Sequence, residues 1–253
     1  ADAHIEKLVN PKLLGHGNHA VYQMVGLKQL LLSSKNEKKS NYEYCDSVIR
    51  ELVDYTFDEN YVNVENSPFY HGYNLDIFVR MPRELFPKLK DRLENIEKYG
   101  REVKRWLTSP NGSYYPIGDT EGKGELLKLR PECFDISVGG VKYVSRDYAS
   151  SGYQIIRSHP EVDELNNSYL VFHATSKSKI HSHCDQLSLI FSWRGVDILT
   201  DPGKYTYESN RWRQHFLSDR AHNTFGVEGR SFYPVDVHLE DTFLNSAVID
   251  KES

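Results

Sequence analysis

The sequence predicts an α+β protein in which a helical region precedes a region of antiparallel strands. Up to about residue 129, apolar residues recur every three or four positions, as they do on the buried face of a helix. After this point apolar and polar residues alternate, as they do in strands with one buried face. Because helices and strands are segregated along the chain, we expect separate layers or domains rather than a parallel α/β sheet. We therefore assign residues 1–129 to a helical domain and residues 130–253 to a β domain.

Helical periodicity occurs in three segments of the first region, at residues 17–34, 44–53 and 83–106. Between the second and third segments, the Asn, Pro and Gly residues of ENSPFYHGY, at 65–73, predict a loop. A glycine-rich loop at 111–124 ends the helical region.

Alternating apolar residues predict six strands in the second region, at residues 134–138, 141–145, 153–157, 169–174, 187–193 and 196–200. The Gly-Gly pair at 139–140 and the Arg-Gly pair at 194–195 predict tight hairpin turns between neighbouring strands. Another strand-like run, at 243–249, comes just before the end of the chain and has no visible closing partner. Since three or four helices are few for an independent helical domain, we expect the chain to be a fragment with a truncated β domain.

Composition indicates a soluble globular protein and disfavours several classes of function. The chain has 253 residues, which is long enough to bury a sizeable core. Its fractions of 39% hydrophobic and 26% charged residues are typical of globular proteins. Its net charge of −5 does not support nucleic-acid binding, and no apolar window is long enough to span a membrane. The first residues lack the pattern of a signal peptide. Cys45, Cys133 and Cys184 are odd in number and lack metal-finger spacing, which favours three unpaired thiols.

Residues that could bind a metal gather between positions 181 and 230. Zinc binds imidazole nitrogen and carboxylate oxygen, and His183, Asp201 and His222 could supply three ligands from neighbouring strand ends. In the alternative, Asp201 caps the Pro-Gly turn that follows it, and His222 bonds to backbone. The pattern His183-x-Asp185, followed by His222, also has the form of the two-His-one-carboxylate site of non-haem iron oxygenases. On spacing alone these alternatives stay open.

An acid/base site needs one group that takes a proton and another that returns it. His181 could be one such group, and Tyr70, Tyr73, Tyr205 and Tyr207, which lie near Pro or Gly, are candidates for the other. A tyrosine titrates far above neutrality unless cations or a metal lie nearby, so core packing is the competing explanation for each.

Four motifs together resemble the heparinase II/III-like polysaccharide lyases. The segments HSHCDQLSL (181–189), TDPGKYTY (200–207) and AHNTF (221–225) resemble that family's β-domain signature. ENSPFYHGY resembles its tyrosine-bearing loop, GNHAVYQ its Asn-His helix start, and PIGDTE its inter-domain loop. The motifs occur in family order and span most of the chain from Gly15 to Arg230.

The resemblance implies an incomplete α/α toroid followed by an antiparallel β-sandwich, with a cleft between them. It also implies β-elimination at a uronic-acid residue of an acidic polysaccharide. In this reaction the C5 proton becomes acidic once the adjacent carboxylate is neutralised. By resemblance Asn18, with His19, would bind that carboxylate, although Asn18 could instead simply cap its helix. Tyr70 and His181 would handle the C5 proton and the departing oxygen, with Tyr207 as a third candidate.

The resemblance further implies that zinc braces the site through His183, Asp201 and His222. Arg211 and Arg213 could line a basic groove, or could be solvated surface charges. An acidic polysaccharide is the implied partner, with no nucleic acid and no membrane span, and this substrate class favours a secreted or periplasmic location. The helical region is shorter than in the family, which predicts an open cleft. The alternative functions are a non-catalytic carbohydrate-binding protein and a glycan hydrolase.

Overall fold

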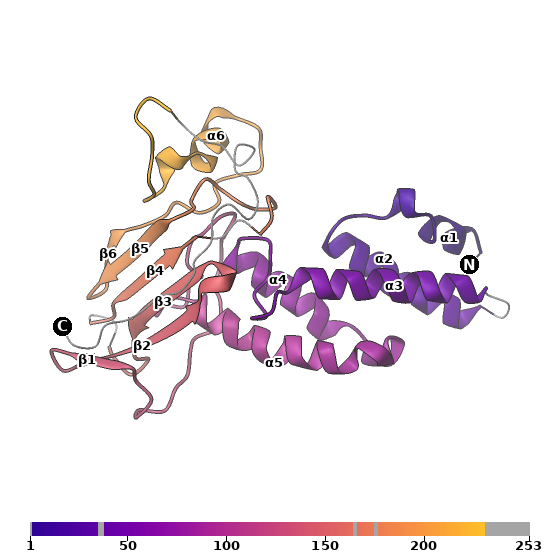
Figure 1. The fold of residues 1–253 in the computed structure, drawn as a ribbon, viewed down its shortest axis with the longest axis horizontal. Helices are drawn as coiled ribbons and strands as arrows, with labels where there is room; N and C mark the ends of the chain where they lie inside the picture. Colours follow the sequence, from indigo (N-terminus) through magenta and orange to yellow (C-terminus); the bar gives the residue numbers. More distant parts are fainter. Residues whose placement is uncertain (1, 35–37, 164–165, 175–176, 231–253) are drawn as a thin grey trace.

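In the computed structural model, a helical arm extends from one side of a twisted antiparallel sheet (Figure 1). The structure describes residues 2–34, 38–163, 166–174 and 177–230. The strand-like run predicted at 243–249 lies outside these residues. Among the helices described, none is long and apolar enough to cross a membrane.

The helical arm consists of α1 (Asp2–Leu8), α2 (Asn18–Ser33), α3 (Lys39–Thr56), α4 (Pro68–Arg80) and α5 (Lys90–Trp106). Each long helix buries residues spaced three or four apart, as Cys45, Ile49 and Val53 do on α3. These faces form one core with apolar residues of α1, α2, α4 and the turns before α5. The helices predicted at 17–34 and 44–53 are therefore confirmed.

Two local predictions in the helical arm are wrong. The loop predicted at 65–73 becomes α4 from Pro68 onward, because Ser67 accepts a hydrogen bond from the backbone of Tyr70 and proline is suited to the first helical position. The helix predicted to begin at residue 83 begins at Lys90. The preceding residues form two short 3₁₀ turns, and Pro87 has no amide proton to continue a helix.

The sheet has six antiparallel strands in sequence order: β1 (Ile136–Val138), β2 (Val141–Tyr148), β3 (Tyr153–Ser158), β4 (Tyr169–His173), β5 (Ser188–Trp193) and β6 (Val196–Leu199). Both predicted hairpins are present. Gly139-Gly140 and Arg194-Gly195 form two-residue turns, and all four residues have positive φ, which glycine tolerates best. The predicted α+β class is confirmed, whereas the toroid and the sandwich remain predictions.

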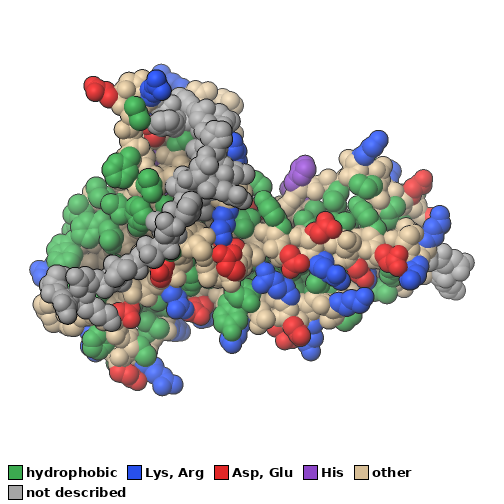
Figure 2. Space-filling view, in the orientation of Figure 1, with side chains coloured by type: hydrophobic (Ala, Val, Ile, Leu, Met, Phe, Trp, Pro, Cys, Tyr) green, Lys and Arg blue, Asp and Glu red, His purple; other side chains and the backbone are tan. Residues whose placement is uncertain are grey.

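The two faces of the sheet have different surroundings. One face buries Val144, Ile155, Val171 and Ile190 against the end of α5 and the segment that follows it. The opposite face exposes apolar side chains, among them Trp193, Val196 and Ile198, and green atoms gather over this part of the molecule in Figure 2. The buried face thus fixes the loop after α5 against the sheet, and this loop carries part of the candidate site.

Candidate functional site

Three of the predicted catalytic residues meet where α4 faces the loops of the sheet. The rings of Tyr70 and His181 stack with centroids 3.4 Å apart and an interplanar angle of 9°. The hydroxyls of Tyr70 and Tyr207 lie 2.8 Å apart and share a hydrogen bond. Burial and this hydrogen bond raise the pKa of Tyr207 above its ordinary value. Tyr205, the other tyrosine of that turn, instead stacks on Phe216.

Backbone contacts hold His181 against the first turn of α4. The side-chain amide of Asn66 donates to the backbone carbonyls of Ser178 and Ile180 at 2.6 and 3.2 Å, which ties the segment before His181 to the start of the helix. His181 itself has φ = +56°, a left-handed conformation that is uncommon for residues other than glycine. Gly118 passes so close that a Cβ there would lie 2.5 Å from the His181 carbonyl oxygen.

The loop after α5 supplies a carboxylate, Asp119, that joins the two histidines of the HSH motif. Its oxygens lie 3.2 Å from His181 Nδ1 and 2.9 Å from His183 Nε2. The guanidinium of Arg213 donates to both oxygens of the same carboxylate. Burial would raise the pKa of Asp119, but the hydrogen bonds from His181, His183 and Arg213 outweigh it and hold this pKa well below its usual range. Asp119 is therefore ionised and fixes the orientation of both imidazoles.

A second carboxylate lies on the other side of His181. Glu65 is nearly buried, and its Oε2 is 3.6 Å from His181 Nε2. Burial raises the pKa of Glu65, and the nearby His181 acts against this effect. His181 thus lies between one carboxylate that is fully hydrogen-bonded and one that is partly desolvated.

Asn18 and His19 begin α2, and their side chains take different directions. Gly17, not Asn18, occupies the position before the helix, so the structure does not support a capping role for Asn18. Asn18 Nδ2 donates to the hydroxyl of Tyr73 at 3.4 Å, which places Asn18 one α4 turn away from Tyr70. The side chain of His19 is exposed.

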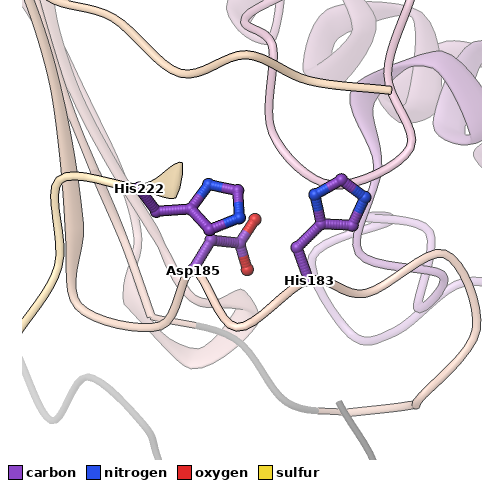
Figure 3. A group of neighbouring side chains, drawn as sticks. All are labelled: His183, Asp185 and His222. Atoms are coloured by element: carbon purple, nitrogen blue, oxygen red, sulfur yellow. The ribbon is translucent and has the colours of Figure 1, made fainter. Parts of the chain in front are cut away.

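A possible metal centre lies beyond Asp119. Ligand atoms of His183, Asp185 and His222 all lie within 4.8 Å of one another, and the three side chains converge in Figure 3. Asp201 lies beside this group instead of completing it: its Oδ2 is 2.6 Å from His222 Nδ1, and its Oδ1 accepts a hydrogen bond from the Gly203 amide. The structure therefore brings two predicted ligands together with Asp185, while Asp201 contacts the group through His222.

The chemistry of this group fits a metal such as zinc. His183 Nδ1 and Asp185 Oδ1 are buried and have no hydrogen-bond partner, which is costly unless another group satisfies them. Both ring nitrogens of His222 have partners, Asp201 at Nδ1 and the Phe216 carbonyl at Nε2, so His222 would bind a metal by exchanging one of these hydrogen bonds. Imidazole nitrogens with one or two carboxylates are a ligand set that zinc accepts.

Comparison with known proteins finds a family similarity in the C-terminal part of the chain. Residues 141–248 match the family described as "Heparinase II/III-like, C-terminal". The resemblance predicted from the motifs is therefore confirmed. No curated protein gave a significant match to the chain.

Solved structures of similar fold include a heparinase III, with a TM-score of 0.58 and 16% identity over 90% of this chain and 42% of its own. A second heparinase III has a TM-score of 0.59 and 17% identity, over 88% of this chain and 39% of its own. The heparan sulfate lyase HepC from Pedobacter heparinus has a TM-score of 0.57 and 15% identity, over 82% of this chain and 37% of its own. At these identities the likeness concerns the fold, and the chain spans about two fifths of these structures.

The matched region, residues 141–248, holds His181, His183 and the other candidate ligands, while Tyr70 and Asp119 come from the preceding part of the chain. Sequence reasoning did not assign a role to Asp119 or Glu65, although both lie in motifs that carry the resemblance. Arg213 was considered as a groove residue, but its guanidinium is bound to Asp119 and largely buried. Arg211 is exposed and lies over the ring of Trp212.

Proposed function

We propose that the protein is a polysaccharide lyase that cleaves an acidic, uronate-containing polysaccharide by β-elimination. The observation that carries the proposal is the stacked pair of Tyr70 and His181, with the Tyr207 hydroxyl in hydrogen-bond contact. These residues place two proton-transferring groups within one site, as an elimination requires. The fold of heparinase III and the family of the C-terminal region support the same reaction class.

The reaction breaks the C5–H and C4–O bonds of a uronate and leaves a double bond between C4 and C5. Tyr70 and His181 would remove the C5 proton and protonate the departing oxygen, with roles that follow from the configuration of the uronate. Asp119 accepts a hydrogen bond from His181 Nδ1, which leaves Nε2 for proton exchange. The Asn18 amide would donate to the uronate carboxylate and stabilise the negative charge that develops there.

His183 and His222, with Asp185 or Asp201, would hold a zinc ion whose contribution is to brace this part of the site. His183 shares Asp119 with His181, so a fixed His183 also keeps the carboxylate in place for His181. Asp185→Asn and Asp201→Asn separate the two possible carboxylate ligands. The variant of the true ligand loses zinc, measured by elemental analysis, and the other retains most of it.

A hydrolase is less consistent with this site. Glycosidases use two carboxyl groups that face the scissile bond, one of them as a proton donor. Glu65 and Asp119 flank His181, but both oxygens of Asp119 are engaged by Arg213 and the histidines. Asp119 therefore cannot serve as the second free carboxyl group.

The proposal is tested by ultraviolet absorbance during incubation with a panel of uronate polysaccharides, because the new C4–C5 double bond is conjugated with the carboxylate. We expect absorbance to rise with wild-type protein and to be lost in Tyr70→Phe, which removes only a hydroxyl. Tyr205→Phe is the matched control and should remain active.

Retained activity in Tyr70→Phe would remove this residue from the mechanism. New reducing ends without ultraviolet absorbance would establish a hydrolase. Polysaccharide binding without cleavage would establish a carbohydrate-binding protein.

A further inference from the structure

An exposed pair of tyrosines continues the candidate site along the helical arm. Tyr22 follows Asn18 by one turn of α2, and Tyr73 follows Tyr70 by one turn of α4, so each lies on the same helix face as a predicted site residue. Their exposed fractions are 56% and 40%, so both rings are accessible to a ligand.

Side-chain contacts connect this pair to the site. The Tyr73 hydroxyl accepts a hydrogen bond from Asn18, and its ring lies edge-on to Tyr70 with centroids 6.1 Å apart. The pKa of Tyr22 is raised by partial burial and by its interaction with Tyr73, while the charge of Arg80 lowers it. Because Asn18 bonds to Tyr73, the face of α2 that carries Tyr22 meets the face of α4 that carries Tyr73. Arg80 lies seven positions after Tyr73 on that same face of α4, so the three residues extend away from the stacked Tyr70.

Arg80 provides a positive charge that is free to bind a ligand. It is the last residue of α4, two turns after Tyr73, and it is exposed. Within the part of the chain that the structure describes, no carboxylate lies within ion-pair distance of Arg80. The cations closer to the stacked pair differ, because Arg213 is paired with Asp119 and Lys204 with Glu121.

We propose that Tyr22, Tyr73 and Arg80 form a distal subsite that binds a carboxylate-bearing sugar residue of the polymer, beyond the residue held at Tyr70. This inference rests on the proposed function and specifies how its substrate is held. The tyrosine rings offer flat apolar surfaces for the C–H face of a sugar, and the Arg80 guanidinium can donate two hydrogen bonds to a carboxylate. A longer chain would therefore bind more tightly than one that fills only the catalytic position.

The kinetic test compares KM for a long polyuronate with KM for the shortest oligouronate that is cleaved. We expect Tyr22→Ala and Arg80→Ala to raise KM for the polymer by about tenfold, an effect typical of losing one well-formed contact. Their kcat and their KM for the shortest substrate should stay close to wild type. Tyr55→Ala and Arg50→Ala are the matched controls, because both residues are exposed on α3.

A binding measurement separates this inference from the lyase proposal. In the Tyr70→Phe background, calorimetry with a uronate hexasaccharide should show about tenfold weaker affinity after Tyr22→Ala or Arg80→Ala. The carboxyl-reduced hexasaccharide should bind equally with or without Arg80. This result would support the subsite even if wild-type protein cleaves no polymer.

Unchanged affinity in both variants would overturn the subsite, as would the same loss in Tyr55→Ala and Arg50→Ala. An equal loss of affinity for the carboxyl-reduced sugar after Arg80→Ala would refute the carboxylate contact. A large fall in thermal midpoint in Tyr22→Ala, with unchanged affinity in the folded fraction, would show that the ring packs against protein instead.

Discussion

Replacement of Gly118 by alanine tests how the loop after α5 positions His181. A Cβ at Gly118 would lie 2.5 Å from the His181 carbonyl oxygen and 2.6 Å from that of Asn66. Both are backbone atoms, so neither can move aside as the end of a flexible side chain could. The same loop makes two hydrogen bonds that would be strained, from the Gly118 amide to Asp185 at 3.1 Å and from the Asp119 amide to the His181 carbonyl at 3.0 Å.

The size of the effect follows from two contributions to the free energy of unfolding. Gly118 has φ = +55°, and placing alanine in this conformation costs about 1 kcal/mol. Overpacking against fixed atoms adds about 1–3 kcal/mol, giving a loss of about 2–4 kcal/mol in Gly118→Ala. Gly122 is the matched control: its φ is +82°, but an added Cβ meets nothing within 4 Å. Gly122→Ala should therefore lose only about 1 kcal/mol.

Urea unfolding of wild type, Gly118→Ala and Gly122→Ala gives the two free-energy differences directly. The proposed lyase activity, measured on the folded fraction of each variant, should fall in Gly118→Ala and be retained in Gly122→Ala, because only the first change displaces His181. Equal stability losses in the two variants would refute the close packing of Gly118 on His181. Full activity in a destabilised Gly118→Ala would show that this packing does not position the imidazole.

Three further predictions concern buried polar groups. Burial lowers the pKa of His71 to about 4, so as the pH falls this histidine is protonated in the unfolded chain before it is protonated in the folded protein. The free energy of unfolding is therefore unaffected by this group above pH 6.5 and falls by up to about 3 kcal/mol as the pH drops toward 4. Urea unfolding of His71→Gln should show a shallower dependence on pH than wild type. His222→Ala should contain less zinc by elemental analysis and unfold at a lower temperature than wild type. The control His215→Ala should keep the zinc content and the unfolding temperature of wild type. Unchanged zinc in His222→Ala would refute its role as a ligand. Asp119→Asn should reduce kcat by roughly 10-fold to 100-fold with little change in KM, because the hydrogen bond that orients His181 is weakened. A similar loss in Glu121→Gln would contradict the orienting role of Asp119.

Much of the fold could be predicted because it depends on local patterns. The two hairpins follow from dipeptides that contain glycine, and α2 and α3 follow from the spacing of their apolar residues. The start of α4 was mispredicted because Pro68 was interpreted as a helix breaker, although after the capping Ser67 it begins the helix.

The arrangement of the site depends on contacts between distant segments, which periodicity does not report. Tyr70 and His181 were paired by family resemblance, not by spacing, and they are 111 positions apart. Asp119 stands in a glycine-rich loop, where aspartate is common as a turn residue, so its position in the sequence does not indicate its role. The choice between Asp185 and Asp201 likewise depends on how a turn presents each carboxylate, and the sequence contains both.

The left-handed backbone of His181 has a consequence for how this position can change during evolution. Holding a histidine at φ = +56° costs about 1 kcal/mol, which glycine would avoid and asparagine would partly avoid. Where the imidazole is needed for catalysis, selection should keep histidine at this position despite the unfavourable backbone conformation. In a lineage that has lost catalysis, drift should instead favour glycine or asparagine here, while Gly118 and Asn66 persist because they shape the surrounding backbone. Replacement of this histidine alone would then mark descendants that keep the fold without its chemistry.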